Sequence, residues 1–314
     1  MFLYVTTLID DLFTQVAVPA FFVFSGYYAF KGHNLEEWAT YKTELKKKTR
    51  TLILPYFLWN ILYLLLLVGK TQLTIALGGT PKDPFTFEWT HLHEYLWTET
   101  IDYPLWFIRD LVVLAFISPL IHFVLRISRG YVVALLFVAC VVFADLTLMP
   151  TFSSRSLLFF SFGSLFALKE WDPIEKLRPW LHPSMVVWIV GTFALPLVYA
   201  WRYFYVLELP YLTLSIVAWV LLFAFICTNY PRLTHMLQHL NQYVFFIYAA
   251  HAVLLINWAR GIVDRIPFFS SSVLGLCTAY IAIAVLALAM SMVLYRVLRR
   301  CTPRLLALFC GGRV

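Results

Sequence analysis

The side chains best suited to catalysis or ligand binding are charged residues that lie inside an apolar run of the sequence. Arg109 and Asp110 are neighbours inside an apolar run, with Trp106 three residues earlier. Ionisable side chains within a membrane-spanning helix are costly and are candidates for function by default. On a helix the two charged neighbours point about 100° apart, so we expect that they do not pair with each other. They would contact a polar ligand or support a developing oxyanion, and the alternative is an ion pair with another helix.

The best acid–base candidate is His251, which lies within a second apolar run. Histidine is the usual general base near neutral pH because its unperturbed pKa is close to that range. His251 follows Gln242 by nine residues, and a rise of about 1.5 Å per residue places it near the middle of a span that begins there. The alternative role is a hydrogen bond between helices.

A basic segment, Lys46-Lys47-Lys48-Thr49-Arg50, directly precedes an apolar run. Such cations can bind the phosphate groups of a nucleotide, and Arg50 is the best candidate because it is nearest to the apolar run. The alternative is an anchor that contacts anionic lipid headgroups. The five cysteines form no Cys-x-x-Cys pair and no Cys/His cluster, so we predict no metal site.

The composition identifies the elements that must position these residues. The chain is 61% hydrophobic and only 13% charged, whereas soluble domains are about 25% charged. We therefore predict an all-α membrane protein, residues 1–314 forming one integral-membrane domain. The expected spans are near 13–31, 53–69, 105–125, 131–149, 152–168, 184–201, 209–228, 242–260 and 272–296.

The basic residues also predict an orientation. Most Lys and Arg residues fall in alternate connecting segments, including 31–51 and the C-terminal tail after 296. The positive-inside rule places these segments, and hence the C-terminus, in the cytoplasm. With nine spans the N-terminus is then outside, although no basic segment precedes it. We therefore expect that one further span precedes Met1, and the alternative is a nine-span protein whose short acidic N-terminus is translocated directly. The net charge is explained by orientation, and no motif indicates nucleic acid.

Four stretches, in order, resemble the acyltransferase-3 family of membrane O-acyltransferases. "VPAFFVFSGYYAFKG" is similar to the family's second span, which ends in Ser-Gly-Tyr or Ser-Gly-Phe, and "KKKTRTLILPYFLWN" to the opening of the next span. "DYPLWFIRDLVVLAFISPLI" resembles the family's Leu-Trp-Phe span and is the most specific match. "YVFFIYAAHAVLLI" resembles its late Tyr-x-x-His span.

The resemblance implies a fold of about ten spans and the transfer of an acyl group, commonly acetyl from acetyl-CoA, to a hydroxyl of an extracytoplasmic glycan. The bacterial inner membrane is the expected location, and a surface glycan or lipid-linked saccharide the expected acceptor. The family's first span carries a basic residue and a histidine separated by ten residues. Neither residue precedes Lys31 here, which agrees with the missing first span and puts activity of this chain in question.

On this basis each candidate residue has an expected role. His251 is the catalytic candidate, Arg50 and Lys46 bind acyl-CoA, and no metal cofactor takes part. The expected substrate-binding residues are Ser25, Tyr27, Trp106, Arg109 and Asp110.

Two other functions remain open from the sequence. The first is a transporter or flippase of a lipid-linked glycan, which could also use the buried charges of Arg109 and Asp110 near the aromatic-rich ends of the spans. No inverted repeat, which such transporters often contain, is visible in the sequence. An inactive truncated relative is the third possibility.

Overall fold

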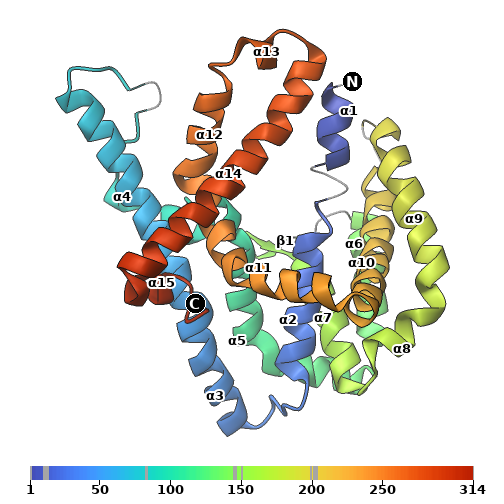
Figure 1. Cartoon of the computed structure of the whole chain (residues 1–314). Coiled ribbons are helices and arrows are strands. Elements are labelled where there is room, and N and C mark those ends of the chain that lie inside the picture. The colour runs from blue at the N-terminus through green and yellow to red at the C-terminus, as the bar shows by residue number, and fades with distance from the viewer. Residues whose placement is uncertain are drawn as a thin grey trace. The chain divides into compact units, whose positions relative to one another are not determined.

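The computed structural model describes residues 2–9, 14–81, 84–143, 147–149, 151–198, 200 and 204–313. These residues form helices with one very short β-hairpin, so the predicted all-α fold class is confirmed (Figure 1). The helices are α1 (Phe2–Thr6), α2 (Ala17–Phe30), α3 (Trp38–Lys48), η2 (Thr49–Ile53), α4 (Leu54–Ala76), η3 (Trp89–His91), η4 (Glu94–Thr98), η5 (Tyr103–Leu105), α5 (Trp106–Ile127), α6 (Tyr131–Phe143), α7 (Ser154–Leu168), α8 (Pro173–Leu177), η6 (Arg178–Trp180), α9 (Leu181–Ala194), η7 (Leu195–Val198), α10 (Phe204–Asn229), α11 (Pro231–Ala250), η8 (His251–Leu255), α12 (Ile256–Val263), α13 (Pro267–Ser270), α14 (Val273–Cys301) and α15 (Pro303–Phe309).

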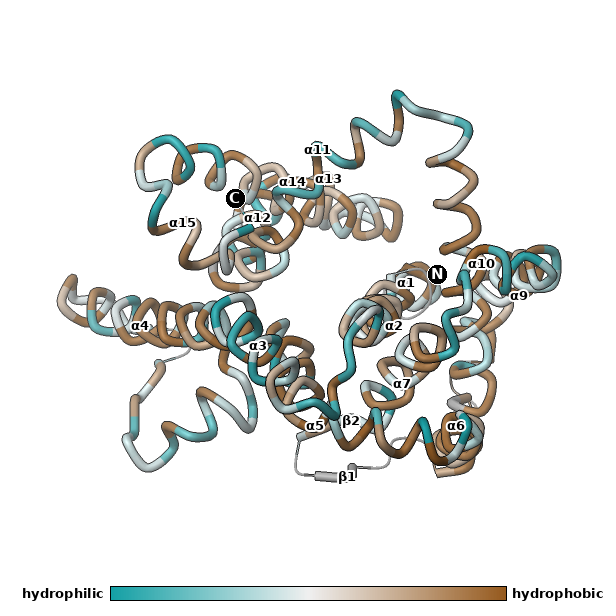
Figure 2. The backbone as a smooth tube through the Cα atoms, turned by 90° about the horizontal axis from the view of Figure 1, so that it is seen from below, coloured by the Kyte–Doolittle hydropathy of each residue, from teal (hydrophilic) through white to brown (hydrophobic). Residues whose placement is uncertain are grey.

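Each of the nine predicted segments contains an apolar helix. Within the described residues five helices are long and apolar enough to cross a membrane, and a bent pair makes a sixth if it counts as one span. Three shorter apolar helices, α2, α6 and α7, occupy three further predicted segments. The length and apolar composition of these helices identify the chain as an integral membrane protein. The count of nine spans stays a prediction. Figure 2 shows hydrophobic colouring along most of these helices and a hydrophilic α3.

Two of the predicted spans differ from the observed elements. The span predicted over 131–149 ends early, because α6 stops at Phe143 and β1 (Thr147–Met149) pairs antiparallel with β2 (Phe152–Ser153). Met149 precedes Pro150, and a residue before proline avoids the helical region. The span predicted from Gln242 begins earlier, at Pro231, and its helix meets α12 at 63°. The straight helix from Gln242 on which the mid-span position of His251 was calculated is thus replaced by a longer, bent pair, and the depth of His251 in the membrane stays a prediction.

The chain forms two compact units. Unit 1 comprises residues 1–45 and 113–239, and unit 2 comprises residues 46–112 and 240–314. The assignment of residues 1–314 to one domain stays a prediction. In unit 1, α2 packs closely along α7. A Cβ atom added at Gly163 would lie 1.8 Å from Val23 O, and one added at Gly26 would lie 2.0 Å from Phe160 O. Glycines at these points allow two backbones to touch, as small residues do between membrane helices.

Unit 2 packs the start of α4 against the C-terminal end of the chain. The Trp59 indole Nε1 donates a hydrogen bond to Phe309 O at 3.0 Å, and its ring meets the rings of Phe246 and Phe309 edge to face. The fully buried Tyr295 of α14 packs on Phe246 of α11. Helices α12 and α14 lie side by side (Figure 1). This aromatic core fixes the start of α4, which carries one wall of the site described below.

Replacing Gly163 with alanine should destabilise unit 1, because the added methyl group would overlap the α2 backbone. Overpacking of this kind typically costs about 1–3 kcal/mol. The measurement is the free energy of unfolding in mixed micelles. Gly69→Ala in α4 is the matched control, since nothing lies within 4 Å of a Cβ atom there, and it should leave stability unchanged or slightly raised. Equal stability of the Gly163→Ala variant and the wild type would contradict the close α2–α7 contact.

Candidate functional site

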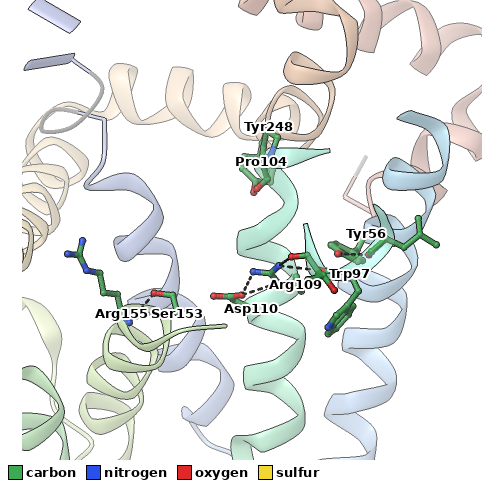
Figure 3. A network of polar contacts seen from close by, with 10 residues as sticks. Tyr56, Trp97, Pro104, Arg109, Asp110, Ser153, Arg155 and Tyr248 are labelled. Atoms are coloured by element: carbon green, nitrogen blue, oxygen red, sulfur yellow. Dashed lines mark hydrogen bonds and ion pairs between the residues drawn. The ribbon is translucent and has the colours of Figure 1, made fainter. Parts of the chain in front are cut away.

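The first two turns of α5 hold the buried pair Arg109 and Asp110. The Arg109 guanidinium donates to Asp110 Oδ1 from Nε at 3.3 Å and from Nη2 at 3.2 Å, and both side chains are buried (Figure 3). The expectation that these neighbours do not pair is therefore wrong. Their Cβ atoms diverge, but the long arginine stem lets the guanidinium turn back to the adjacent carboxylate. The pair places compensated charge in a membrane helix.

The rest of the Arg109 guanidinium holds the preceding loop. Its Nη1 donates to the carbonyl oxygens of Trp97 at 3.1 Å and Thr98 at 3.0 Å. On the other side of this loop, the Tyr56 hydroxyl of α4 donates to Leu96 O at 2.7 Å. Arg109 therefore works as a clamp that fixes the segment before α5, in addition to its ion pair with Asp110.

The clamped loop presents an aromatic surface. The Trp97 ring meets the Tyr56 ring edge to face at 5.9 Å and leaves 36% of the residue exposed. An indole held in place with one face accessible can pack against a flat ligand surface. Trp106, which was expected to bind substrate, is half-buried at the start of α5.

Asp102 is a buried carboxyl group that the sequence analysis missed. The residue has no exposed surface, and neither carboxyl oxygen has a hydrogen-bond partner among the described residues. Its backbone N–H donates to Asn60 Oδ1 of α4 at 3.2 Å, so the main chain is fixed. Burial raises the pKa of the Asp102 carboxyl to about 7. Its only sequence signal is that it is an acidic residue three positions before Leu105, the first residue of the Leu-Trp-Phe stretch.

Next to this segment, α11 brings in Tyr248, and the following π-helical turn η8 begins with His251. The Tyr248 hydroxyl donates to Pro104 O, and its ring packs edge to face on Phe107 at 5.6 Å (Figure 3). One turn later, His251 Nδ1 lies 3.0 Å from Ile247 O and 2.9 Å from Tyr248 O. Carbonyl oxygens only accept hydrogen bonds, so Nδ1 must carry the proton. In the neutral ring Nε2 then has the lone pair, which is the state that a general base requires.

The basic segment lies at the start of unit 2. Lys46 lies in the last turn of α3 and Arg50 lies in η2, and both side chains are exposed. No described carboxylate forms a salt bridge with either residue. The C-terminal tail packs here, because a Cβ atom at Gly311 would lie 2.7 Å from Thr51 O. Their exposure leaves room for an anionic ligand, and their role in binding acyl-CoA stays a prediction.

The remaining predicted substrate residues, Ser25 and Tyr27, belong to α2 in unit 1. Ser25 is half-buried, and Tyr27 lines an apolar cavity. Gly26 between them packs against the α7 backbone. Ser25 and Tyr27 thus belong to unit 1, whereas Arg109, Asp110 and His251 all lie in unit 2.

The loop histidines show no metal site. His91 Nδ1 lies 2.7 Å from Glu94 Oε2, and this contact raises the pKa of His91 and lowers that of Glu94. His93 is largely exposed. Across the described ranges, no group of three or more His, Cys, Asp or Glu residues could hold a metal ion.

Comparison with known proteins gives one family and one curated relative. The model of the acyltransferase-3 family, described as an acyltransferase domain, matches residues 1–296. The succinoglycan biosynthesis protein ExoH of Rhizobium meliloti (strain 1021) is 26% identical over 327 residues, covering 97% of this chain and 80% of ExoH. No solved structure matches the chain.

The buried Asp102 carboxyl should make stability depend on pH. Because its pKa is raised on folding, the native state binds the proton more tightly than the unfolded state, and stability must fall as pH rises through the window from about 4 to 7. Between pH 5 and 8 the expected loss in the free energy of unfolding is about 3 kcal/mol. Its titratable neighbours, Tyr63 and Tyr248, are phenols that ordinarily ionise above this range.

Unfolding in mixed micelles at both pH values measures this effect. Asp102→Asn should remove most of the decrease, whereas Asp264→Asn, which changes an exposed carboxyl of the same unit, should keep it. An Asp102→Asn variant with the same pH dependence as the wild type would show that Asp102 is not the buried titrating group.

Proposed function

This chain belongs to the acyltransferase-3 family, and we propose that it is a membrane O-acyltransferase that modifies a cell-surface polysaccharide. The donor is an acyl-CoA, with acetyl-CoA and therefore an acetyl group as the leading case, and the acceptor is a glycan hydroxyl. The observation that carries the proposal is the His251 ring, whose Nδ1 faces two backbone carbonyls and whose Nε2 is left as the basic nitrogen. A family assignment alone names no residue for the proton transfer that acylation of a hydroxyl requires.

The acceptor side of the proposal rests on unit 2 and on the curated relative. That relative is named for succinoglycan biosynthesis, and succinoglycan is a polysaccharide. The accessible Trp97 indole, fixed through its carbonyl by Arg109, offers the flat apolar surface on which a sugar ring packs. A lipid-linked saccharide would present the same hydroxyl groups to this surface.

The donor side of the proposal rests on charge. Coenzyme A carries three phosphate groups, which arginine and lysine bind through charge-assisted hydrogen bonds. Arg50 and Lys46 are exposed cations without a described salt-bridge partner, at the N-terminal end of α4. We assign this segment to the cytoplasmic face and the protein to the bacterial inner membrane, with the C-terminus inside, because the positive-inside rule favours that orientation.

The chemistry that we assign is a balanced acyl transfer. The acceptor oxygen attacks the thioester carbonyl carbon while His251 Nε2 takes the hydroxyl proton. The new C–O ester bond forms, the C–S bond breaks, and the departing thiolate receives a proton to give free CoA. The backbone carbonyls of Ile247 and Tyr248 keep the Nδ1 proton in place, so the imidazolium that forms is stabilised. No metal enters this scheme.

Replacing His251 with glutamine should strongly reduce transfer. Glutamine is polar and of similar size, but it cannot accept the hydroxyl proton, and loss of a general base typically lowers kcat about 10²–10⁴-fold. The measurement is the formation of hydroxylamine-labile ester on an exopolysaccharide oligosaccharide, using full-length protein and radiolabelled acetyl-CoA. The Michaelis constants of both substrates should change little.

His235→Gln is the matched control, because His235 is exposed on α11, the helix that directly precedes His251, and it should transfer at the wild-type rate. Wild-type rates in the His251 variant would remove this residue from the reaction. A wild-type protein that moves a lipid-linked saccharide across vesicles without consuming acetyl-CoA would instead support the transporter alternative.

Replacing Arg50 with alanine should weaken donor binding selectively. Loss of one charge-assisted phosphate contact should raise the dissociation constant of acetyl-CoA about 10–100-fold. Acetyl-pantetheine, which carries the thioester without the nucleotide, should bind both proteins equally. Titration calorimetry on the full-length protein measures these constants, with Arg265→Ala as the control. An equal loss of affinity for both donors would show that Arg50 supports the fold rather than the phosphates.

A further inference from the structure

Unit 1 contains a cavity that the proposed transfer reaction does not use. It has a volume of about 250 Å³ and lies between α2, α7, α8 and α10. The close contact of α2 with α7 forms one side, since Gly163 of that contact lines the cavity. The short helix α8 covers one end. Three separate stretches of the sequence, namely α2, α7 with α8, and α10, thus build this space within a single unit.

The lining of the cavity is apolar. Phe159, Phe162 and Phe166 contribute from α7, and Ile216 and Val217 contribute from α10. Aliphatic and aromatic walls of this kind leave no set of hydrogen-bond donors and acceptors for a sugar ring, which needs several. A hydrocarbon chain matches this surface because it needs no polar partner.

The cavity is open on a side where large apolar side chains are exposed. Three residues that line it are exposed: Phe24 at 43%, Tyr28 at 66% and Ile174 at 42%. In a membrane protein such side chains face lipid, and hydrocarbon there can pass from the bilayer into the cavity without crossing water. The opening therefore favours a ligand that is already dissolved in the membrane.

A single basic side chain stands at the rim. Lys31 directly follows the last residue of α2, and its ammonium nitrogen lies 5.1 Å from the centre of the Tyr27 ring. No described carboxylate makes a salt bridge with Lys31. The nearby Asp172 attracts Lys31 electrostatically without a salt bridge, and its Oδ1 accepts backbone hydrogen bonds from Ile174 and Glu175 as the cap of α8. Lysine placed where an apolar helix ends is suited to a phosphate at the lipid headgroup level.

From these contacts we propose that the cavity binds one acyl chain of a membrane phospholipid, whose phosphate pairs with Lys31. The chain fills the space between α2, α7 and α10, and the headgroup stays at the rim beside α8. Acyl-CoA fits this site less well, because Lys31 is the only basic residue among those that line it and the three phosphates of CoA need several cations. The inference goes beyond the proposed transfer reaction and does not depend on it.

Native mass spectrometry of the full-length, delipidated protein tests the proposal with three probes. Phosphatidylglycerol should bind with one molecule per protein, and diacylglycerol with the same chains but no phosphate should bind about tenfold more weakly. Palmitoyl-CoA should not displace the phospholipid. Lys31→Gln should lower the affinity for phosphatidylglycerol to that for diacylglycerol, and Val220→Trp, which fills the cavity from α10, should abolish binding of both.

Two control variants separate the site from general lipid contact. Lys169→Gln changes an exposed lysine of the same unit, and Leu222→Trp adds an indole on α10 at a residue that does not line the cavity. Both should bind phosphatidylglycerol like the wild type. Equal retention by all five proteins would overturn the proposal in favour of annular lipid, and displacement by palmitoyl-CoA would reassign the cavity to the acyl donor. Because Lys31→Gln alters only a rim residue, the test stands even if Val220→Trp fails to fold.

Discussion

Burial of the Arg109 charge is the constraint on which the candidate site depends. An arginine at the start of an apolar helix is tolerated only if its charge is balanced and its donors are satisfied. Asp110 supplies the balancing charge, and the carbonyl oxygens of Trp97 and Thr98 satisfy Nη1. The need to compensate one buried cation therefore fixes the loop before α5. The position of the Trp97 indole follows from that loop.

Asp102 lies in the same segment, but its buried carboxyl group, unlike that of Asp110, has no compensating partner among the described residues. Its carboxyl oxygens are as deeply buried as those of Asp110, but no described group donates to them. An uncompensated buried carboxyl is destabilising when ionised, and such groups gather at functional sites. The segment from η4 to α5 thus combines a satisfied ion pair with an unsatisfied acid.

The orientation of the His251 ring accompanies a local change of helix type. It begins η8, a π-helical turn that follows α11, and the chain bends by 63° between α11 and α12. Such turns often occur at functional sites, because the shifted hydrogen-bond ladder leaves side chains and carbonyls in new positions. Here two carbonyls of the preceding turn meet His251 Nδ1. The basic nitrogen, Nε2, results from this backbone geometry, without a carboxylate partner among the contacts described.

The sequence allowed the helices to be predicted but only part of the site. Runs of about 20 apolar residues are a local property, so all nine predicted segments contain helices. The first half of α11 was missed because residues 231–241 are mostly polar. The Arg109–Asp110 ion pair was not expected, because the Cβ atoms of neighbouring helical residues point in different directions. The long arginine side chain nevertheless lets the guanidinium reach the adjacent carboxylate. Asp102 was missed because its burial depends on Asn60, Tyr63 and Tyr248, residues that are distant in sequence.

The central claim is that acyl-CoA on the basic face donates to a glycan on the opposite face. Proteoliposomes containing full-length protein of known orientation, with acetyl-CoA and oligosaccharide in separate compartments, test it most directly. The account predicts acetyl ester on the oligosaccharide only when acetyl-CoA is on the side of Arg50 and the oligosaccharide is on the other side, with one free CoA released per ester. Ester formed only when both substrates share one compartment, or none in any arrangement, would contradict it.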